Sequence, residues 1–264
     1  MARSISKAMA DILQELELEN ESYITTGRLQ ELAEKYSIGS SPSLIASRLK
    51  KEGWLIATSQ RGVWEFAPAA VAGSYSKNDP LMSIKTFMIA NPDTPCYLCM
   101  QSAAWVLGVA DRLPSHTEVA FPEVSKKHLS IHILGYYYKP NIEIVTKKGV
   151  PSLAPESVLV HMTTKPSNVR SWDSAMEWLP DLVYETETET ILKELNGRPN
   201  SVHQRTGYLL QSMYPDAAKA IKESIQIRSK VRFGPRERAL RNDEDWMISD
   251  TLLSFSPKEM EKVK

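Results

Sequence analysis

The sequence has few cysteines, no excess of charge of either sign and no long apolar run. Its 264 residues include two cysteines, and 32 basic side chains are balanced by 32 acidic ones. Two cysteines cannot form the framework of a disulfide-rich secreted domain. No stretch approaches the roughly 20 apolar residues that cross a bilayer, and the opening MARSISKAMADILQELELEN turns acidic where a signal peptide needs its apolar segment. We therefore expect a cytoplasmic protein with no membrane partner.

Motifs for catalysis, metals and cofactors are also missing. The sequence contains no Walker loop, no G-x-G-x-x-G and no G-x-S-x-G, and its five histidines are scattered. Cys96 and Cys99 form a lone C-x-x-C, whereas a structural zinc site needs four ligands. Ordinary packing of both thiols is favoured over metal or redox chemistry. We expect no catalytic residue, no metal and no cofactor, although a constellation assembled only in three dimensions stays open.

The length predicts about two domains. A small, polar stretch that ends at Pro80 has no sustained apolar period and is typical of a linker. The predicted organisation is an N-terminal domain over residues 1–70, a linker over 71–80 and a C-terminal domain over 81–264. No internal repeat is present.

Three helices and a hairpin are predicted in the N-terminal domain. The first helix spans residues 4–16 and the second begins at Thr26 as its N-cap. The third has Ser41 as N-cap, Pro42 in its first turn and Gly53 just past its end. A hairpin over 54–58 and 63–66 follows. Leu44 is expected near the boundary of the third helix's inner face. The apolar side chains expected to face the core are Ile5, Met9, Ile12, Leu13, Leu16, Leu29, Leu32, Ala33, Tyr36, Ile45 and Leu49.

This layout is that of a winged helix-turn-helix, in which the third helix enters the major groove of DNA. Small hydroxyl side chains let a helix approach base edges, and cations meet phosphates. A single such module has limited surface, so dimeric or cooperative binding to inverted half-sites is expected. The same residues could instead be solvated, or serve a protein-interaction module. The candidate DNA-binding residues are Ser43, Ser47, Arg48, Lys50, Lys51 and Arg61.

The C-terminal domain mixes helix and strand signals. Strands are expected over 118–121, 129–134 and 142–145, where Ile131 and Ile133 alternate with polar residues. The fold class is therefore α+β, with a winged helix-turn-helix followed by a larger mixed α/β domain. Helices are expected over 100–110, 156–163, 172–179, 201–213 and 216–226.

Three further clusters invite a functional interpretation. Tyr136, Tyr137 and Tyr138 could stack on a nucleotide, although such tyrosines more often straddle core and surface. An acidic run over 173–189 opposes a basic run over 222–241. The basic run could contact DNA or a partner, pair with the acidic run, or be solvated. Its candidate contact residues are Arg228, Lys230, Arg232, Arg236, Arg238 and Arg241.

The order of several segments resembles that of the AbiEi-type antitoxins of abortive-infection, type IV toxin–antitoxin systems. The N-terminal part carries RLKKEGWL and RGVWEFAP. Further on, DTPCYLCMQSAAWVLGVADRLPSHTEVAFP resembles the apolar helix, loop and strand of the family, and SVHQRTGYLLQSMYPDAAKAIKESI its late helix pair. RFGPRERALRNDEDWMIS resembles a basic loop that leads to a Trp-containing final strand. The resemblance covers most of the chain.

The resemblance implies an antitoxin that represses its own operon through a winged helix and counteracts a nucleotidyltransferase-like toxin. The implied partners are double-stranded operator DNA and that toxin, with or without direct contact. A winged-helix transcription factor that senses a ligand and has no toxin is the alternative interpretation. An enzyme acting on nucleic acid is a third.

Overall fold

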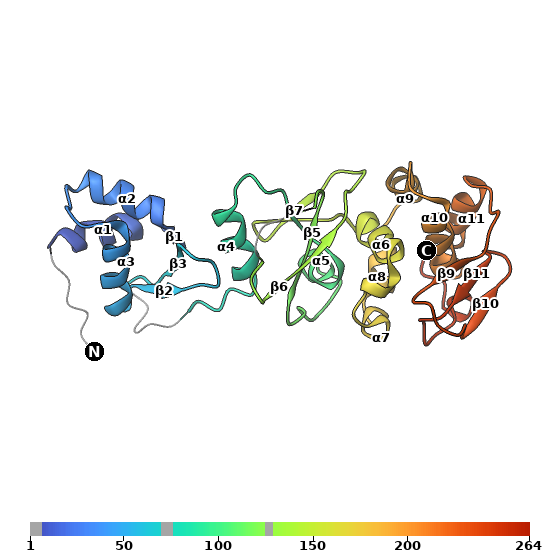
Figure 1. The fold of residues 1–264 in the computed structure, drawn as a ribbon. Helices are drawn as coiled ribbons and strands as arrows, with labels where there is room; N and C mark the ends of the chain where they lie inside the picture. Colours follow the sequence, from blue (N-terminus) through green and yellow to red (C-terminus); the bar gives the residue numbers. More distant parts are fainter. Residues whose placement is uncertain (1–6, 70–75, 125–128) are drawn as a thin grey trace. The chain divides into compact units, whose positions relative to one another are not determined.

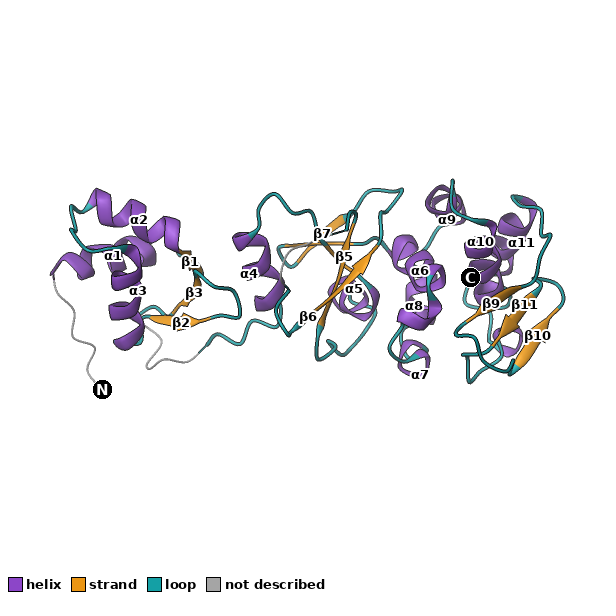
Figure 2. Cartoon of the chain, viewed as in Figure 1, coloured by secondary structure: helices purple, strands orange, loops and turns teal. Residues whose placement is uncertain are grey.

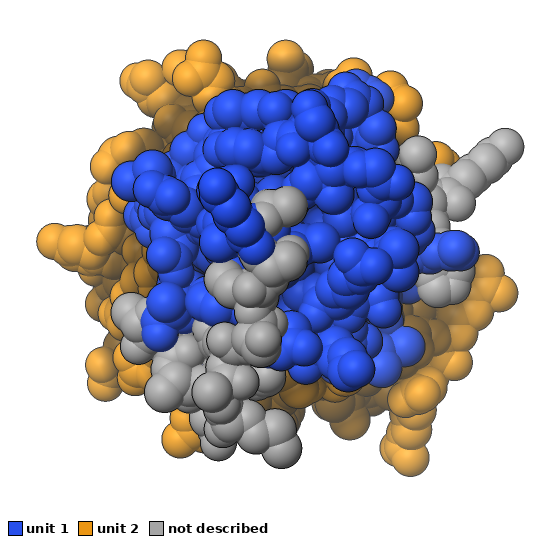
Figure 3. All heavy atoms as spheres, turned by 90° about the vertical axis from the view of Figure 1, so that its left-hand side faces the viewer, with its two compact units in different colours: residues 1–95, 127–133 blue, residues 96–126, 134–264 orange. Residues whose placement is uncertain are grey.

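The structure, a computed structural model, describes residues 7–69, 76–124 and 129–264 (Figure 1). The chain forms two compact units, one of residues 1–95 and 127–133 and the other of residues 96–126 and 134–264 (Figure 3). No helix of the described residues is long and apolar enough to cross a bilayer.

The N-terminal unit combines helices with a small antiparallel sheet (Figures 1 and 2). The sheet has the order β1-β3-β2, with Ile24 opposite Trp64 and Ile56 opposite Glu65. The elements are α1 (Lys7–Leu18), β1 (Tyr23–Thr25), α2 (Thr26–Lys35), α3 (Pro42–Lys51), β2 (Leu55–Ala57), β3 (Val63–Phe66) and α4 (Met82–Ala90).

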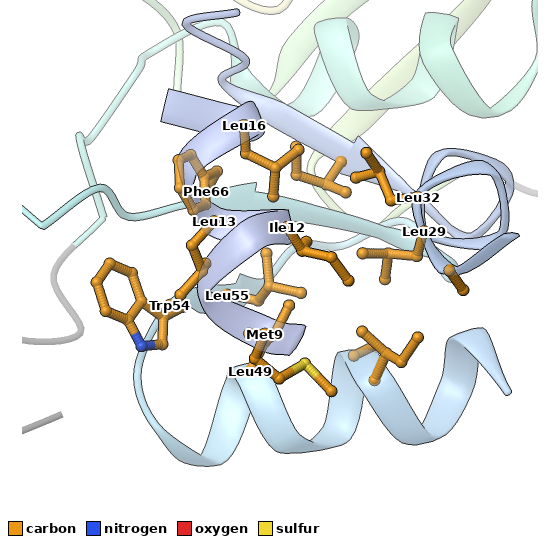
Figure 4. Packing of buried hydrophobic residues seen from close by; sticks show 14 residues of the cluster. Met9, Ile12, Leu13, Leu16, Leu29, Leu32, Leu49, Trp54, Leu55 and Phe66 are labelled. Carbon is orange, nitrogen blue, oxygen red and sulfur yellow. The ribbon is translucent and has the colours of Figure 1, made fainter. Parts of the chain in front are cut away.

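The apolar faces predicted for the first three helices are confirmed where the structure describes them; Ile5 lies outside the described residues. The predicted side chains from Met9 to Ala33 and both Ile45 and Leu49 are buried, and Tyr36 packs half-buried against them. Figure 4 shows Leu49 of α3 pointing into this cluster, which also holds Leu55 and Phe66. The cluster fixes which face of α3 is turned outward.

The predicted N-cap of α2 is wrong by one residue. Thr25, not Thr26, has the extended backbone of a cap, and its Oγ1 accepts a hydrogen bond from the Arg28 N–H at 3.0 Å. Thr25 also ends β1, a strand that the sequence did not predict. The strand constrains Thr25 to the β region, which a cap residue needs.

Helix α4 belongs to the N-terminal unit, because its residues contact β1 and β3. Asp79 connects β1 to α4. Its carboxylate accepts a hydrogen bond from the Tyr23 hydroxyl of β1 at 3.0 Å and pairs with Lys85 of α4 at 2.7 Å. The predicted division at residues 70 and 81 stays a prediction.

The C-terminal unit contains a five-stranded sheet of order β6-β5-β4-β8-β7 and a three-stranded sheet of order β10-β11-β9. The first sheet consists of β4 (Tyr97–Leu98), β5 (Thr117–Phe121), β6 (Ile133–Tyr137), β7 (Val145–Lys147) and β8 (Val150–Ser152). The second consists of β9 (Val231–Phe233), β10 (Arg241–Asp243) and β11 (Ile248–Asp250). The helices are α5 (Met100–Leu107), α6 (Pro155–Thr164), α7 (Trp172–Ala175), α8 (Leu179–Tyr184), α9 (Thr188–Leu195), α10 (Asn200–Leu210) and α11 (Pro215–Glu223).

The α+β class and the mixed C-terminal part are confirmed, but some predicted elements are wrong. The strand expected over 129–134 begins only at Ile133, because a turn closed by the Ile133 N–H and the Ser130 carbonyl precedes it, and Ile131 is 82% exposed. The strand expected over 142–145 begins only at Val145. The single helix expected over 172–179 is two short helices, α7 and α8, with Pro180 in the first turn of the second.

Candidate nucleic-acid interface

Helix α3 presents a polar, cationic face opposite its apolar one. Ile45, Ala46 and Leu49 are buried. The outward and inward faces predicted from the helical period are confirmed. The exposed side chains of α3 include the five predicted DNA-binding residues, Ser43, Ser47, Arg48, Lys50 and Lys51.

Both ends of α3 form as the sequence predicts. Ser41 has an extended backbone, Pro42 opens the helix, and Gly53 takes a positive φ of 76° just after it. Ser41 makes no side-chain cap; its hydroxyl lies 3.1 Å from that of Ser43 instead. The first turn of α3 therefore carries two adjacent hydroxyls on the outside of the unit.

Arg61 lies in the turn between β2 and β3, and its side chain is exposed. Thr58 Oγ1 holds this turn by donating to the Val63 carbonyl at 2.8 Å and accepting from the Gln60 N–H at 3.2 Å. Gly62 has a φ of 79°, and its carbonyl accepts from the Thr26 N–H at 3.0 Å. These bonds hold Arg61 next to the first turn of α2.

Charge is distributed unevenly over the N-terminal unit. Lys35 pairs with Glu15 at 2.7 Å, and the Lys35 and Tyr36 side chains lower the pKa of Glu15. Around Arg28 the excess is anionic, since this one guanidinium pairs with Glu15, Glu19, Glu21 and Glu31.

The cations of α3 and of the hairpin turn differ from Lys35 and Arg28 in their ion pairing. Within the described residues, none of Arg48, Lys50, Lys51 and Arg61 forms an ion pair, and Glu52 is the one acidic residue between Ser40 and Gly62. A phosphate backbone attracts unpaired, exposed cations of this kind.

Leu44, which the helical period places near the boundary between the two faces, is a further exposed residue of α3. Its side chain is 44% exposed at the third position of α3, although its neighbour Ile45 is fully buried. The period places Leu44 beside Ser47 and Arg48, one turn further along the helix.

The basic run of the C-terminal unit divides into two groups. Arg241 is used inside the fold: its Nη1 donates to Asp250 Oδ2 at 2.8 Å and to the carbonyls of Leu253 and Phe255 at 2.8 and 2.6 Å. The other five predicted contact residues are exposed around β9 and the loop that follows it: Arg228, Lys230, Arg232, Arg236 and Arg238.

The acidic run over 173–189 lies along α7, α8 and the start of α9. Among the described residues its ion-pair partner is Lys264, whose Nζ lies 2.7 Å from Glu187 Oε1, and Ser254 donates to Asp173. Among the described residues no ion pair joins the basic run to the acidic run, and the five candidate contact residues other than Arg241 are exposed.

The three consecutive tyrosines have different environments. Tyr137 is 67% exposed, whereas Tyr138 is buried and donates to Glu194. Glu194 is itself fully buried and pairs with Arg198. Besides these two partners, Glu194 accepts from the Ser157 hydroxyl at 3.0 Å and from the Asn141 and Ile142 N–H groups at 2.9 and 3.1 Å. This network positions the loop before β7 against α6 and α9.

His161 stacks on Tyr138, with ring centroids 4.3 Å apart. Burial lowers the pKa of His161 to about 3, and the nearby Arg198 charge acts in the same direction. At neutral pH the imidazole is therefore uncharged.

Cys96 and Cys99 are both buried free thiols at the ends of β4. Burial raises the pKa of Cys96 to about 11 and that of Cys99 well above its ordinary value. Such thiols carry little nucleophilic thiolate. In the part of the chain that the structure describes, no group of three or more His, Cys, Asp or Glu side chains could hold a metal ion.

Glu118 of β5 faces the first turn of α5. It accepts from the Ser102 N–H at 3.3 Å, and the Ser102 hydroxyl accepts from the Glu118 N–H at 2.9 Å. Burial raises the pKa of Glu118 to about 7, although the N–H groups of Ser102 and Gln101 lower it. Its carboxyl therefore titrates near neutral pH.

Comparison with known proteins identifies the fold and one domain. No curated protein matches the chain. The crystal structure of the RV2827C protein from Mycobacterium tuberculosis has a similar fold, with a TM-score of 0.80 and 22% sequence identity over 95% of this chain and 94% of that chain. Residues 97–212 match the family model of the AbiEi antitoxin C-terminal domain. This segment begins at β4 and ends just beyond α10.

The resemblance predicted from the sequence is thus confirmed over that segment, and it supports the role of an antitoxin in a toxin–antitoxin system. Over residues 97–212 the chain is therefore similar to the AbiEi antitoxin C-terminal domains.

Proposed function

We propose that this antitoxin binds its own operator DNA through the N-terminal unit, which acts as a winged helix-turn-helix, and so represses its own operon. The observation that carries the proposal is the outward face of α3, where exposed serines and unpaired cations lie together. The order α1, β1, α2, α3, β2, β3 also supports it, since α3 follows α2 after a short turn and a hairpin follows α3.

Each residue of the face has a role that fits its chemistry. Ser43 and Ser47 are small enough for α3 to approach base edges, and their hydroxyls donate or accept there. Arg48 reaches either bases or backbone. Lys50 and Lys51 meet phosphates and supply the salt-dependent part of the affinity. Arg61, at the tip of the hairpin, contacts the adjacent minor groove or phosphates.

The operator is expected to present two half-sites. One unit of this size offers limited surface, so two copies bound to inverted repeats would supply useful specificity. The exposed cations Arg228, Lys230, Arg232, Arg236 and Arg238 add contacts to flanking DNA or to a partner. Arg241 is left out, because Asp250 already neutralises its charge.

We assign protection against a nucleotidyltransferase-like toxin to the C-terminal unit, without catalysis by the antitoxin itself. The match of residues 97–212 to the antitoxin family supports this assignment. Co-expression with the neighbouring toxin gene tests it: the chain should restore growth, and a pull-down then distinguishes direct contact from indirect protection.

Fluorescence anisotropy tests DNA binding. The labelled duplex is taken from upstream of the protein's own gene, a scrambled duplex of the same composition is the control, and both are titrated over a series of salt concentrations. Tight, sequence-dependent binding that weakens with salt is expected. Binding to neither duplex would overturn the DNA role and leave the N-terminal unit as a protein-interaction module.

A ligand-sensing transcription factor without a toxin is the second candidate. A polar cleft of about 560 Å³ in the C-terminal unit favours it, with Tyr208, Asn242 and Lys258 in its lining. Clefts of this volume accommodate small molecules. A metabolite that raises the melting temperature in proportion to its concentration, together with failure to protect against the toxin, would favour this function.

A further inference from the structure

Leu44 is an exposed apolar side chain on a helix whose other outward residues are polar. It is 44% exposed, whereas the core cluster of the N-terminal unit takes Ile45, Ala46 and Leu49 from α3. Leu44 is not part of this core cluster. Exposing part of a leucine to water is unfavourable, because apolar surface gains free energy when it is removed from water. The position is therefore suited to a partner that covers it.

Its place on the helix says where that partner would lie. Leu44 is the third residue of α3, which starts at Pro42. In helix-turn-helix proteins the N-terminal residues of this helix face the base edges, while later residues meet the backbone. Leu44 is flanked by Ser43 in sequence and by Ser47 one turn on. The cations Lys50 and Lys51 lie at the far end of the helix.

The bases differ in what they offer to such a side chain. In the major groove, thymine carries an apolar group, its C5-methyl, whereas the other edges present hydrogen-bond donors and acceptors. Leucine has no polar atom to satisfy those groups. Serine hydroxyls beside it can donate to or accept from either base of a pair. The combination fits a thymine methyl packed against an isobutyl side chain.

We infer that Leu44 contacts the C5-methyl of a thymine in the major groove. Helix α3 then prefers an A·T pair in one orientation over the other base pairs at that position. This inference rests on the DNA binding proposed above and goes beyond it by naming the base contacted and the residue that contacts it.

Replacing thymine by deoxyuridine tests the contact at the level of one methyl group. The substitution removes the C5-methyl and keeps base pairing and every donor and acceptor. Each thymine of the bound duplex is replaced singly, and wild-type protein and Leu44→Ala are titrated with all duplexes. At one position in each half-site, wild-type affinity should fall by about threefold to tenfold. Leu44→Ala should bind the thymine duplex correspondingly more weakly and should no longer distinguish thymine from deoxyuridine there.

Leu18→Ala is the matched control, since Leu18 is 78% exposed at the end of α1 in the same unit. It should keep the full sensitivity to deoxyuridine. Thermal unfolding checks that both variants remain folded. Sedimentation compares their oligomeric state with that of the wild type.

The outcomes separate the inference from the proposed function. If the wild type binds every deoxyuridine duplex as tightly as the thymine duplex, or if Leu44→Ala keeps the discrimination, the inference is overturned while DNA binding stands. A change of oligomeric state in Leu44→Ala would also overturn it, because the leucine would then belong to a protein interface. Absence of any salt-dependent, sequence-dependent binding overturns the proposed function itself, and the inference with it.

Discussion

Gly207 of α10 lies directly under the indole ring of Trp246. A Cβ added to Gly207 would be 2.0 Å from Trp246 Cη2, far inside contact distance. Trp246 lies in the turn before β11, not in the final strand that the sequence suggested, and it is buried. Gln204, one turn earlier on α10, donates to the Trp246 carbonyl at 2.9 Å. The pair thus joins the last sheet to α10.

Gly207→Ala should destabilise the C-terminal unit despite the higher helix propensity of alanine. The propensity gain is about 1 kcal/mol, whereas forcing atoms into a packed contact costs about 1–3 kcal/mol or more. Urea unfolding followed by tryptophan fluorescence measures the difference. Gly39→Ala is the control, since a Cβ there meets nothing within 4 Å. Equal stability of both variants would contradict the close packing.

Leu49→Ala should lower the free energy of unfolding by about 2–5 kcal/mol, because Leu49 is 1% exposed in the core of the N-terminal unit. Leu44→Ala, on the outward side of the same helix, should cost far less. Chemical denaturation of the two variants compares them directly. A near-native midpoint for Leu49→Ala would mean that α3 is rotated from the orientation described.

Lys50→Ala/Lys51→Ala should weaken DNA binding uniformly across sequences and reduce the slope of log affinity against log salt by about two. Both lysine side chains are exposed, so the fold should be unaffected. Anisotropy over a salt series measures the slope. The charge-matched control is Lys193→Ala/Lys219→Ala, on α9 and α11. An unchanged slope in the folded double variant of α3 would argue against this DNA-binding face.

His161 should make the protein sensitive to acid. Its pKa is about 3 in the folded state, below the ordinary value of 6.5, so the unfolded chain binds the proton more readily. The stability that this group supplies is present above pH 6.5 and is lost as the pH falls toward 3, by up to about 4 kcal/mol. His161→Phe should flatten the dependence of the free energy of unfolding on pH in that window. An unaltered pH profile would show that the imidazole is not held in its neutral form.

Glu118 should make the free energy of unfolding fall as the pH rises, opposite to the effect of His161. Burial raises its folded-state pKa to about 7 from 4.5, so its contribution is present below pH 4.5 and is lost as the pH rises through 7. Glu118→Gln should remove this decline, which amounts to roughly 3 kcal/mol at most. Free energies of unfolding from pH 4.5 to pH 8 measure it. A variant with the wild-type slope would place the titration elsewhere.

The N-terminal unit could be predicted largely from sequence, because its helices are marked by residues that lie close together along the chain. The helical period selected Leu29, Leu32, Ile45 and Leu49, and Ser41 with Pro42 marked the start of α3. Strand β1 was missed because three residues carry no period and its partner, β3, lies some forty residues further along the chain. Tertiary pairing, not propensity, forms such a strand.

The C-terminal unit depends more on partners that are distant in sequence. Its strands are two to five residues long, too short for a pattern to fix their ends. Arg241 was grouped with exposed cations because the sequence does not reveal that Asp250 faces it. Four of the five partners of the Glu194 carboxylate likewise come from two distant segments, residues 138–142 and Ser157, so neither its burial nor its role could be predicted.

In the proposed complex with DNA, the hydrogen bond between the Thr26 N–H and the Gly62 carbonyl would limit how the unit can fit a duplex. It fixes the hairpin tip to the start of α2 before any partner arrives, so little conformational entropy remains to be lost when Arg61 and α3 engage together. The distance between the contact made by Arg61 and the contact made by α3 is then set by the fold of the protein. If the proposed DNA binding holds, the duplex would have to supply the matching groove geometry, and a sequence that bends or narrows readily there would bind with the smaller deformation energy.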